Sequence, residues 1–159
     1  MKKLTVSGYE VLVDDAHENL LVSGPAWSVS TRDNLHYLRR KNGSERGGRS
    51  AEFLHRLILD CPEGMVIDHI NGNGLDNRTE NLRTCSHAEN MRNRKRHKNN
   101  KSGYKGVYRD CRRERLQWRA QIRFEGKKLS IGSYETPEEA HKAYMIEAKN
   151  LHKEFARSA

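Results

Sequence analysis

Hydrophobic and polar residues alternate with period two in the C-terminal third of the chain. Between residues 117 and 124 the apolar positions are Trp118, Ala120, Ile122 and Phe124, and the polar positions are Gln117, Arg119, Gln121 and Arg123. This alternation predicts a strand with one face packed on a core and one polar, basic face. After a turn at residues 125–126, a second strand is predicted, with Leu129 and Ile131 inward and Lys128 and Ser130 outward.

The pattern changes to helical periodicity after residue 135. Thr136 can cap a helix, Pro137 suits its first position, and Glu139 completes a capping box. The apolar residues that follow fall on one stripe, which comprises Ala140, Ala143, Tyr144, Ala148 and Leu151. Together with a short strand predicted at residues 103–110, these elements predict a three-stranded antiparallel sheet packed on one helix.

Residues 65–84 predict two short strands joined by a tight loop. The apolar residues 65–67 lead into Asp68 and His69. The Asn-Gly pairs at 71–74 favour a reversal of the chain, and residues 81–84 can return as the second strand.

A helix is predicted directly after these strands. Ser86 and Glu89 match a capping box, so the helix is expected to begin near His87. Asn90 then lies on its first turn and faces the strand that bears Asp68. We expect the helix to run on to Arg96.

The first fifty residues are patterned less clearly. They predict a strand at 9–13, a short helix at 15–21, paired strands at 27–30 and 35–38, and a loop at 43–48. We expect this segment to complete the core around the apolar run 54–59, in which His55 is interpreted as a packed core residue.

The charge of the chain indicates a polyanionic partner. The formal net charge is +9 and the isoelectric point is about 9.6. Residues 91–101 contain six Lys or Arg and no acidic residue. Such clusters bind nucleic acid through counterion release. Arg92, Arg94 and Arg96 are therefore expected to contact the DNA backbone, with a solvated charge run as the alternative.

Several classes of protein are disfavoured by the composition. No run approaches the roughly 20 apolar residues that span a bilayer, and no secretory apolar core follows the N-terminus. A soluble, cytoplasmic protein without a membrane partner is expected. Cys61, Cys85 and Cys111 are widely spaced, which indicates neither a disulfide framework nor a structural zinc site.

The residue types at 68–90 suit metal-dependent phosphodiester hydrolysis. Histidine accepts protons near neutral pH, so His69 is the candidate general base. Asp68 and Asn90 offer hard oxygen ligands for one magnesium or manganese ion per active site. No small-molecule cofactor is expected.

This segment resembles the HNH nucleases with the ββα-metal fold, and among them the homing endonucleases of phages and mobile elements. The resemblance implies that Asn81 belongs to the catalytic set, ties the strands together and orients the His69 loop. It also implies double-stranded DNA as substrate, with 5′-phosphate and 3′-hydroxyl products. Asn90 stands where bacteriocin nucleases carry histidine. His87 is open to two interpretations, a phosphate or metal contact and a structural histidine. The stretch that carries the resemblance is Asp68-His69-Ile70-Asn71-Gly72-Asn73-Gly74-Leu75-Asp76-Asn77-Arg78, then Glu80-Asn81-Leu82-Arg83.

The C-terminal pattern resembles the ethylene-response-factor (apetala-two) DNA-binding domain over about residues 102–151. That family lays its sheet in the major groove. Ser130 stands where plant members usually have tryptophan, and Asp110 where a basic residue is common. The alternative is a sheet that packs on the nuclease domain. The resemblance implies DNA contacts by Lys105, Tyr108, Arg119, Gln121, Arg123, Lys128 and Ser130.

These observations predict an α+β protein with a small ββα-metal HNH domain and a three-stranded antiparallel sheet packed on one helix. The expected organisation is a β-rich leader at 1–50, the nuclease at 51–95, a basic linker at 96–102 and the DNA-binding domain at 103–159. We expect a metal-dependent DNA endonuclease whose C-terminal module selects the site. The alternatives are a DNA-binding regulatory or packaging protein with an inactive HNH fold and an RNA-binding protein. The oligomeric state stays open.

Overall fold

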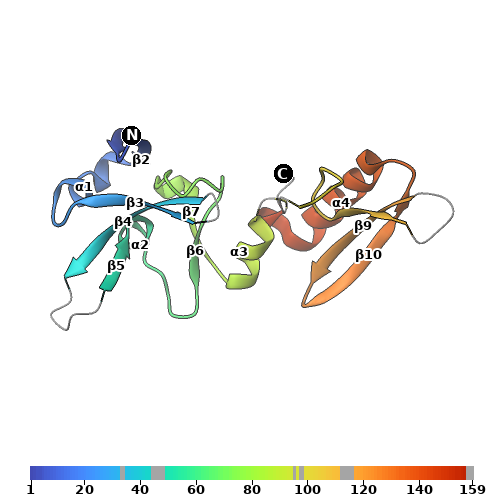
Figure 1. The fold of residues 1–159 in the computed structure, drawn as a ribbon. Coiled ribbons are helices and arrows are strands. Elements are labelled where there is room, and N and C mark those ends of the chain that lie inside the picture. Colours follow the sequence, from blue (N-terminus) through green and yellow to red (C-terminus); the bar gives the residue numbers. More distant parts are fainter. Residues whose placement is uncertain (33–34, 44–48, 95, 97–98, 112–116, 157–159) are drawn as a thin grey trace. The chain divides into compact units, whose positions relative to one another are not determined.

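The computed structural model describes residues 1–32, 35–43, 49–94, 96, 99–111 and 117–156 (Figure 1). The chain divides into two compact units, Met1–Asn90 and Met91–Ala159. Both units combine small antiparallel sheets with short helices, so the α+β prediction is confirmed. Among the described residues, no helix has the length and apolar character needed to cross a membrane.

The N-terminal part of the first unit is built from two small sheets. β1 (Lys2–Val6) pairs with β2 (Tyr9–Val13), and β3 (Trp27–Arg32), β4 (Leu35–Gly43) and β5 (Arg49–Phe53) form the second sheet in that order. A 3₁₀ helix (Asp15–His17) and α1 (Asn19–Val22) lie between the sheets in the chain. The predicted strands are confirmed, the helix predicted at 15–21 is divided into the 3₁₀ helix and α1, and β1 was not predicted. Residues 44–48 of the predicted loop lie outside the described residues.

One apolar core joins this segment to the rest of the first unit. Its buried members are Val11, Val13, Leu38, Leu54 and Leu75. Leu54 opens α2 (Leu54–Ile58), and Leu75 belongs to the loop between Asp68 and Asn81. The leader therefore packs on the segment that carries the candidate nuclease residues.

The predicted order of strand, loop, strand and helix is confirmed. β6 (Val66–His69) pairs antiparallel with β7 (Leu82–Cys85), and α3 (His87–Asn93) follows. The capping box is formed, because Ser86 N donates to Glu89 Oε2 at 2.8 Å and Glu89 N donates to Ser86 Oγ at 3.3 Å.

The expected continuation of this helix to Arg96 is wrong, because α3 ends at Asn93. In a longer helix the Arg92 carbonyl would accept the N–H of residue 96. Instead the Lys105 ammonium donates to the carbonyls of Arg92 and Arg94, the latter at 2.9 Å. A cation thus satisfies the exposed carbonyls and terminates the helix.

The second unit is the predicted sheet and helix. β8 (Val107–Asp110), β9 (Gln117–Phe124) and β10 (Lys127–Tyr134) form a sheet in the order β10-β9-β8. α4 (Pro137–His152) starts with the expected capping box and leads into a 3₁₀ helix (Lys153–Phe155). The core of this unit consists of Val107, Ala120, Ile122, Ala140, Tyr144 and Ala148.

Candidate nuclease site

Asp68 and His69 leave β6 on opposite faces, because successive side chains of a strand alternate. Asp68 lies directly opposite Arg83 in the β6–β7 pair. Arg83 Nε and one terminal nitrogen donate to Asp68 Oδ2 at 3.0 and 2.8 Å. Asp68 is 5% exposed, so its carboxylate forms a buried ion pair that the sequence did not predict.

Cys85 connects the Asp68 face with the start of α3. Burial raises the pKa of its thiol to about 11, and the Asp68 carboxylate acts in the same direction. A hydrogen bond with the backbone N–H of Asn90 lowers the pKa of the same thiol. The thiol therefore lies near the Asp68 carboxylate and the backbone N–H of Asn90, where the hairpin meets α3.

His69 occupies the other face, within a cluster of rings. Its Nε2 lies 3.4 Å from Asn77 Oδ1, and its ring centroid lies 5.9 Å from that of Tyr37 and 5.2 Å from that of His55. Burial lowers the pKa of His69, against the effects of the Asn77 hydrogen bond and of the carboxylates of Asp68 and Asp76. The imidazole is thus kept in the neutral form that a general base requires.

His55 lies in the core, as its sequence context indicated, and also contacts His69. Its ring stacks on Phe53 with centroids 5.6 Å apart and meets the His69 ring edge to face. Burial, and then the nearby His69, lowers the pKa of His55 to about 3. Its Nδ1 has no hydrogen-bond partner within the described part of the chain.

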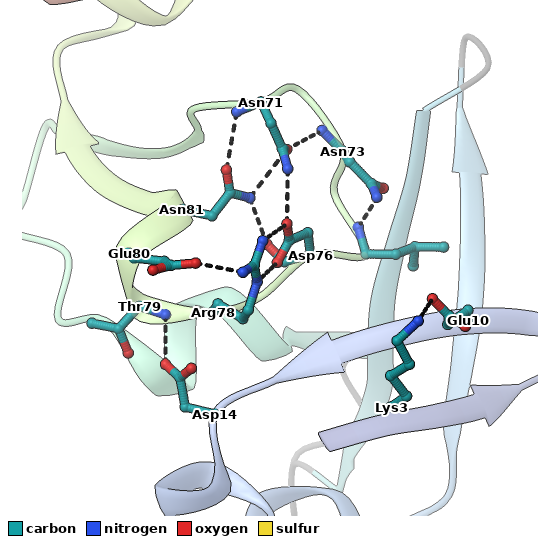
Figure 2. A network of polar contacts seen from close by, with 11 residues as sticks. Lys3, Glu10, Asp14, Asn71, Asn73, Asp76, Arg78, Thr79, Glu80 and Asn81 are labelled. Atoms are coloured by element: carbon teal, nitrogen blue, oxygen red, sulfur yellow. Dashed lines mark hydrogen bonds and ion pairs between the residues drawn. The ribbon is translucent and has the colours of Figure 1, made fainter. Parts of the chain in front are cut away.

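Asn81 holds the loop that follows His69 (Figure 2). Its Oδ1 accepts the backbone N–H of Asn71 at 3.0 Å, and its Nδ2 donates to the Asp76 carbonyl at 2.7 Å and to Asn71 Oδ1 at 3.1 Å. These contacts span the loop from its first residues to its last. They suit the orienting role that the resemblance implied for Asn81.

The same loop contains an ion-pair network that the sequence did not reveal. Arg78 donates to both carboxylate oxygens of Asp76 at 2.8 Å and also pairs with Glu80 (Figure 2). The Arg78 guanidinium lowers the pKa of Asp76. Gly74 adds a close approach to β4, because a Cβ there would lie 2.4 Å from the His36 carbonyl oxygen.

The N-terminal segment is bonded to this loop through its backbone. Leu12 N donates to the Leu75 carbonyl at 2.9 Å, and Asn77 N donates to the Leu12 carbonyl at 2.8 Å. Asp14 Oδ2 accepts the Thr79 N–H at 2.8 Å (Figure 2), which lowers the pKa of Asp14. β2 therefore contributes directly to the conformation of the candidate site.

The remaining candidates on and after α3 differ in exposure. His87, Arg94 and Arg96 are exposed, whereas Arg92 is half-buried, with its guanidinium 5.9 Å from the centre of the Phe124 ring. A phosphate contact by His87 stays a prediction.

The donor chemistry fits a hard divalent cation. One carboxylate and one amide oxygen, with water and phosphate completing the shell, are typical of magnesium sites. The described residues contain no cluster of three or more His, Cys, Asp or Glu side chains that would hold a metal by themselves. A cation at Asp68 would compete with Arg83 for Oδ2.

In the second unit the register gathers six predicted DNA contacts on the sheet face away from the core. Arg119 pairs with Tyr108, Gln121 with Ser130, and Arg123 with Lys128.

Arg119 and Lys105 make contacts within the unit. Arg119 Nε lies 3.3 Å from both Asp110 Oδ2 and Ser133 Oγ. Lys105 lies before β8, with its ammonium on the end of α3. Neither contact was predicted.

Comparison with known proteins identifies an endonuclease family and a phage relative. Residues 60–92 match the HNH endonuclease family, and this range includes Asp68, His69, Asn81 and Asn90. The chain is 38% identical over 96 residues to protein 3.8 of Escherichia phage T7, an alignment that covers 60% of this chain and 77% of the relative. No solved structure matches the chain. The chain therefore belongs to the family of phage T7 protein 3.8 and carries an HNH endonuclease domain at residues 60–92.

Proposed function

We propose that this protein is a divalent-metal-dependent DNA endonuclease that cuts at sites selected by its C-terminal unit. One observation carries the proposal. The segment that matches HNH endonucleases folds as two strands and a helix, with Asp68 and a neutral His69 at the end of the first strand and Asn90 on the helix.

The reaction follows from these residue types. His69 takes a proton from the attacking water as the water oxygen bonds to phosphorus. The bond from phosphorus to the 3′ oxygen breaks, and the products are a 5′ phosphate and a 3′ hydroxyl. Asp68 and Asn90 would hold one magnesium or manganese ion, which stabilises the negative charge that develops on the phosphate oxygens.

The cleavage test is the replacement of His69. His69→Ala is expected to lower magnesium-dependent cleavage of plasmid DNA by at least about 100-fold, because general-base catalysis contributes a factor of that order. His17→Ala is the matched control, because His17 lies outside the site. Cleavage by His69→Ala at the wild-type rate would refute the assignment.

The outer face of the second unit supports the selection of sites. It carries Arg119, Arg123 and Lys128 beside polar side chains able to bond base edges. Tethering such a surface to a nuclease raises the effective concentration of the active site at its target.

Binding experiments test this part separately. Arg119→Ala with Arg123→Ala is expected to weaken DNA binding and to reduce the slope of log affinity against log salt by about 2. Lys142→Ala with Lys149→Ala removes the same charge from exposed positions on α4 and serves as the control. Equal losses in both double variants would show that net charge, not the sheet face, determines binding.

A second candidate function is a DNA-binding regulatory or packaging protein with an inactive HNH fold. The buried ion pair of Asp68 with Arg83 favours it, since that carboxylate is already neutralised. DNA binding without cleavage across a magnesium and manganese titration would select this alternative.

A further inference from the structure

We infer that Asn77 is a positioning residue for the His69 imidazole, and that β2 holds Asn77 in place. The inference rests on the proposed function, in which His69 is the general base. Asn77 is fully buried, at 0% exposure, so it acts through His69 and not on the substrate.

The hydrogen bond between the two side chains determines which imidazole nitrogen carries the hydrogen. Asn77 Oδ1 lies 3.4 Å from His69 Nε2, and an amide oxygen only accepts hydrogen bonds. Nε2 must therefore carry the hydrogen, which leaves the lone pair on Nδ1 as the proton acceptor. The rings of Tyr37 and His55 lie against the imidazole, with centroids 5.9 and 5.2 Å from its centre.

The backbone of Asn77 is bonded to β2. Its backbone N–H donates to the Leu12 carbonyl at 2.8 Å, next to the parallel bridge between Leu12 and Asp76. Asp76 is bound by Arg78 through both carboxylate oxygens. A continuous set of bonds therefore runs from β2 through Asn77 to His69.

Stability does not explain the amide group of Asn77. Its Nδ2 is buried and has no hydrogen-bond partner within the described part of the chain. A buried donor without a partner costs about 1–3 kcal/mol, and an apolar side chain of similar volume would avoid that cost. A polar residue at this position is explained by its bond to His69.

Kinetics of three variants test the inference. Asn77→Leu removes the acceptor at similar volume and is expected to lower kcat about 10- to 100-fold, the range seen when a partner that orients a functional histidine is removed. KM for DNA should stay unchanged. Asn77→Asp keeps an acceptor oxygen and should restore kcat. Val29→Ala perturbs the same core from β3, outside the bonds between β2 and Asn77, and should lower stability alone.

Nuclear magnetic resonance of the histidine rings distinguishes a positioning role of Asn77 from a purely structural one. The Nε2-bound proton of His69, assigned by its loss in His69→Ala, should resonate downfield in the wild type, Asn77→Asp and Val29→Ala. It should move upfield in Asn77→Leu. If the leucine variant does not fold, the wild-type spectrum decides, because an Nδ1–H tautomer overturns the inference.

The failures of the two proposals are distinguishable. If His69→Ala abolishes cleavage but Asn77→Leu cuts DNA with the wild-type kcat, only the role of Asn77 is refuted. A wild type that cuts no DNA refutes the proposed function and the kinetic part of the inference, and the Nε2 resonance still decides whether Asn77 bonds to His69.

Discussion

Arg83 and Asp68 face each other across the β6–β7 hairpin, with two guanidinium nitrogens on a single carboxylate oxygen at 3.0 and 2.8 Å. The side chains are only 14% and 6% exposed. The carboxylate proposed to bind a metal ion thus already has a cation beside it within the fold. Arg83 and the metal ion can stabilise the same negative charge.

Replacement of Arg83 tests this relationship. Arg83→Met leaves Asp68 as a buried charge without its ion-pair partner, which is expected to cost about 3 kcal/mol of unfolding free energy without metal. Magnesium should then recover part of the loss, so its stabilising effect on the melting temperature should exceed that in the wild type. Arg56→Met removes the same charge at an exposed position of the first unit and is the control. An equal response to magnesium in wild type and Arg83→Met would contradict the prediction.

Stability should fall with acidification because of His55. Its folded-state pKa of about 3 lies below the value of about 6.5 in the unfolded chain. Between these values the unfolded chain binds the proton, so the stability present at pH 7 is lost by up to about 1.4 kcal/mol per pH unit as pH falls.

His55→Phe keeps a ring in the cluster and removes the titration. Denaturant unfolding at several values between pH 5 and 7 should show a slope reduced by close to one proton at pH 5 and by about half a proton at pH 6.5. The control, His17→Gln, removes a histidine that lies outside the buried ring cluster. A slope unchanged in His55→Phe would show that His55 is protonated in the native state.

Lys105 should matter more for stability than for DNA binding. Its ammonium bonds the carbonyls at the end of α3, and hydrogen bonds to charged groups contribute about 1.5–3 kcal/mol. Lys105→Met should therefore lower the unfolding free energy by about 2 kcal/mol. Lys101→Met, at an exposed position nearby, should not. A large change in the salt dependence of DNA binding with unchanged stability would instead support the direct DNA contact that the sequence predicted.

Asp110 should influence the DNA contact that we propose for Arg119. The buried carboxylate holds Arg119 Nε, which restricts the orientation of the guanidinium on the outer sheet face. Asp110→Asn is expected to strengthen binding at low salt, because a negative charge is lost, while it weakens discrimination between sequences. Selection from a random DNA pool measures both effects. Glu135→Gln, an exposed change of the same charge, is the control, and equal discrimination in all three proteins would contradict the prediction.

Local sequence patterns predicted much of the secondary structure. The capping boxes at Ser86 and Thr136 and the alternation along residues 117–124 depend on residues a few positions apart, and the elements they predicted are present. The end of α3 was predicted wrongly because the group that terminates it, the Lys105 ammonium, lies twelve residues beyond Asn93.

Local patterns were enough to predict the α+β class, the order of elements around Asp68 and His69, and the basic outer face of the second unit, because period and spacing are local properties. The folded chain was needed to show that Asp68 pairs with Arg83, that His55 and Asn77 lie beside His69, and that β2 bonds to the loop at residues 75–77. These contacts join residues 8 to 65 positions apart. Their partners are chosen by chain topology and burial, which no short pattern of residues records.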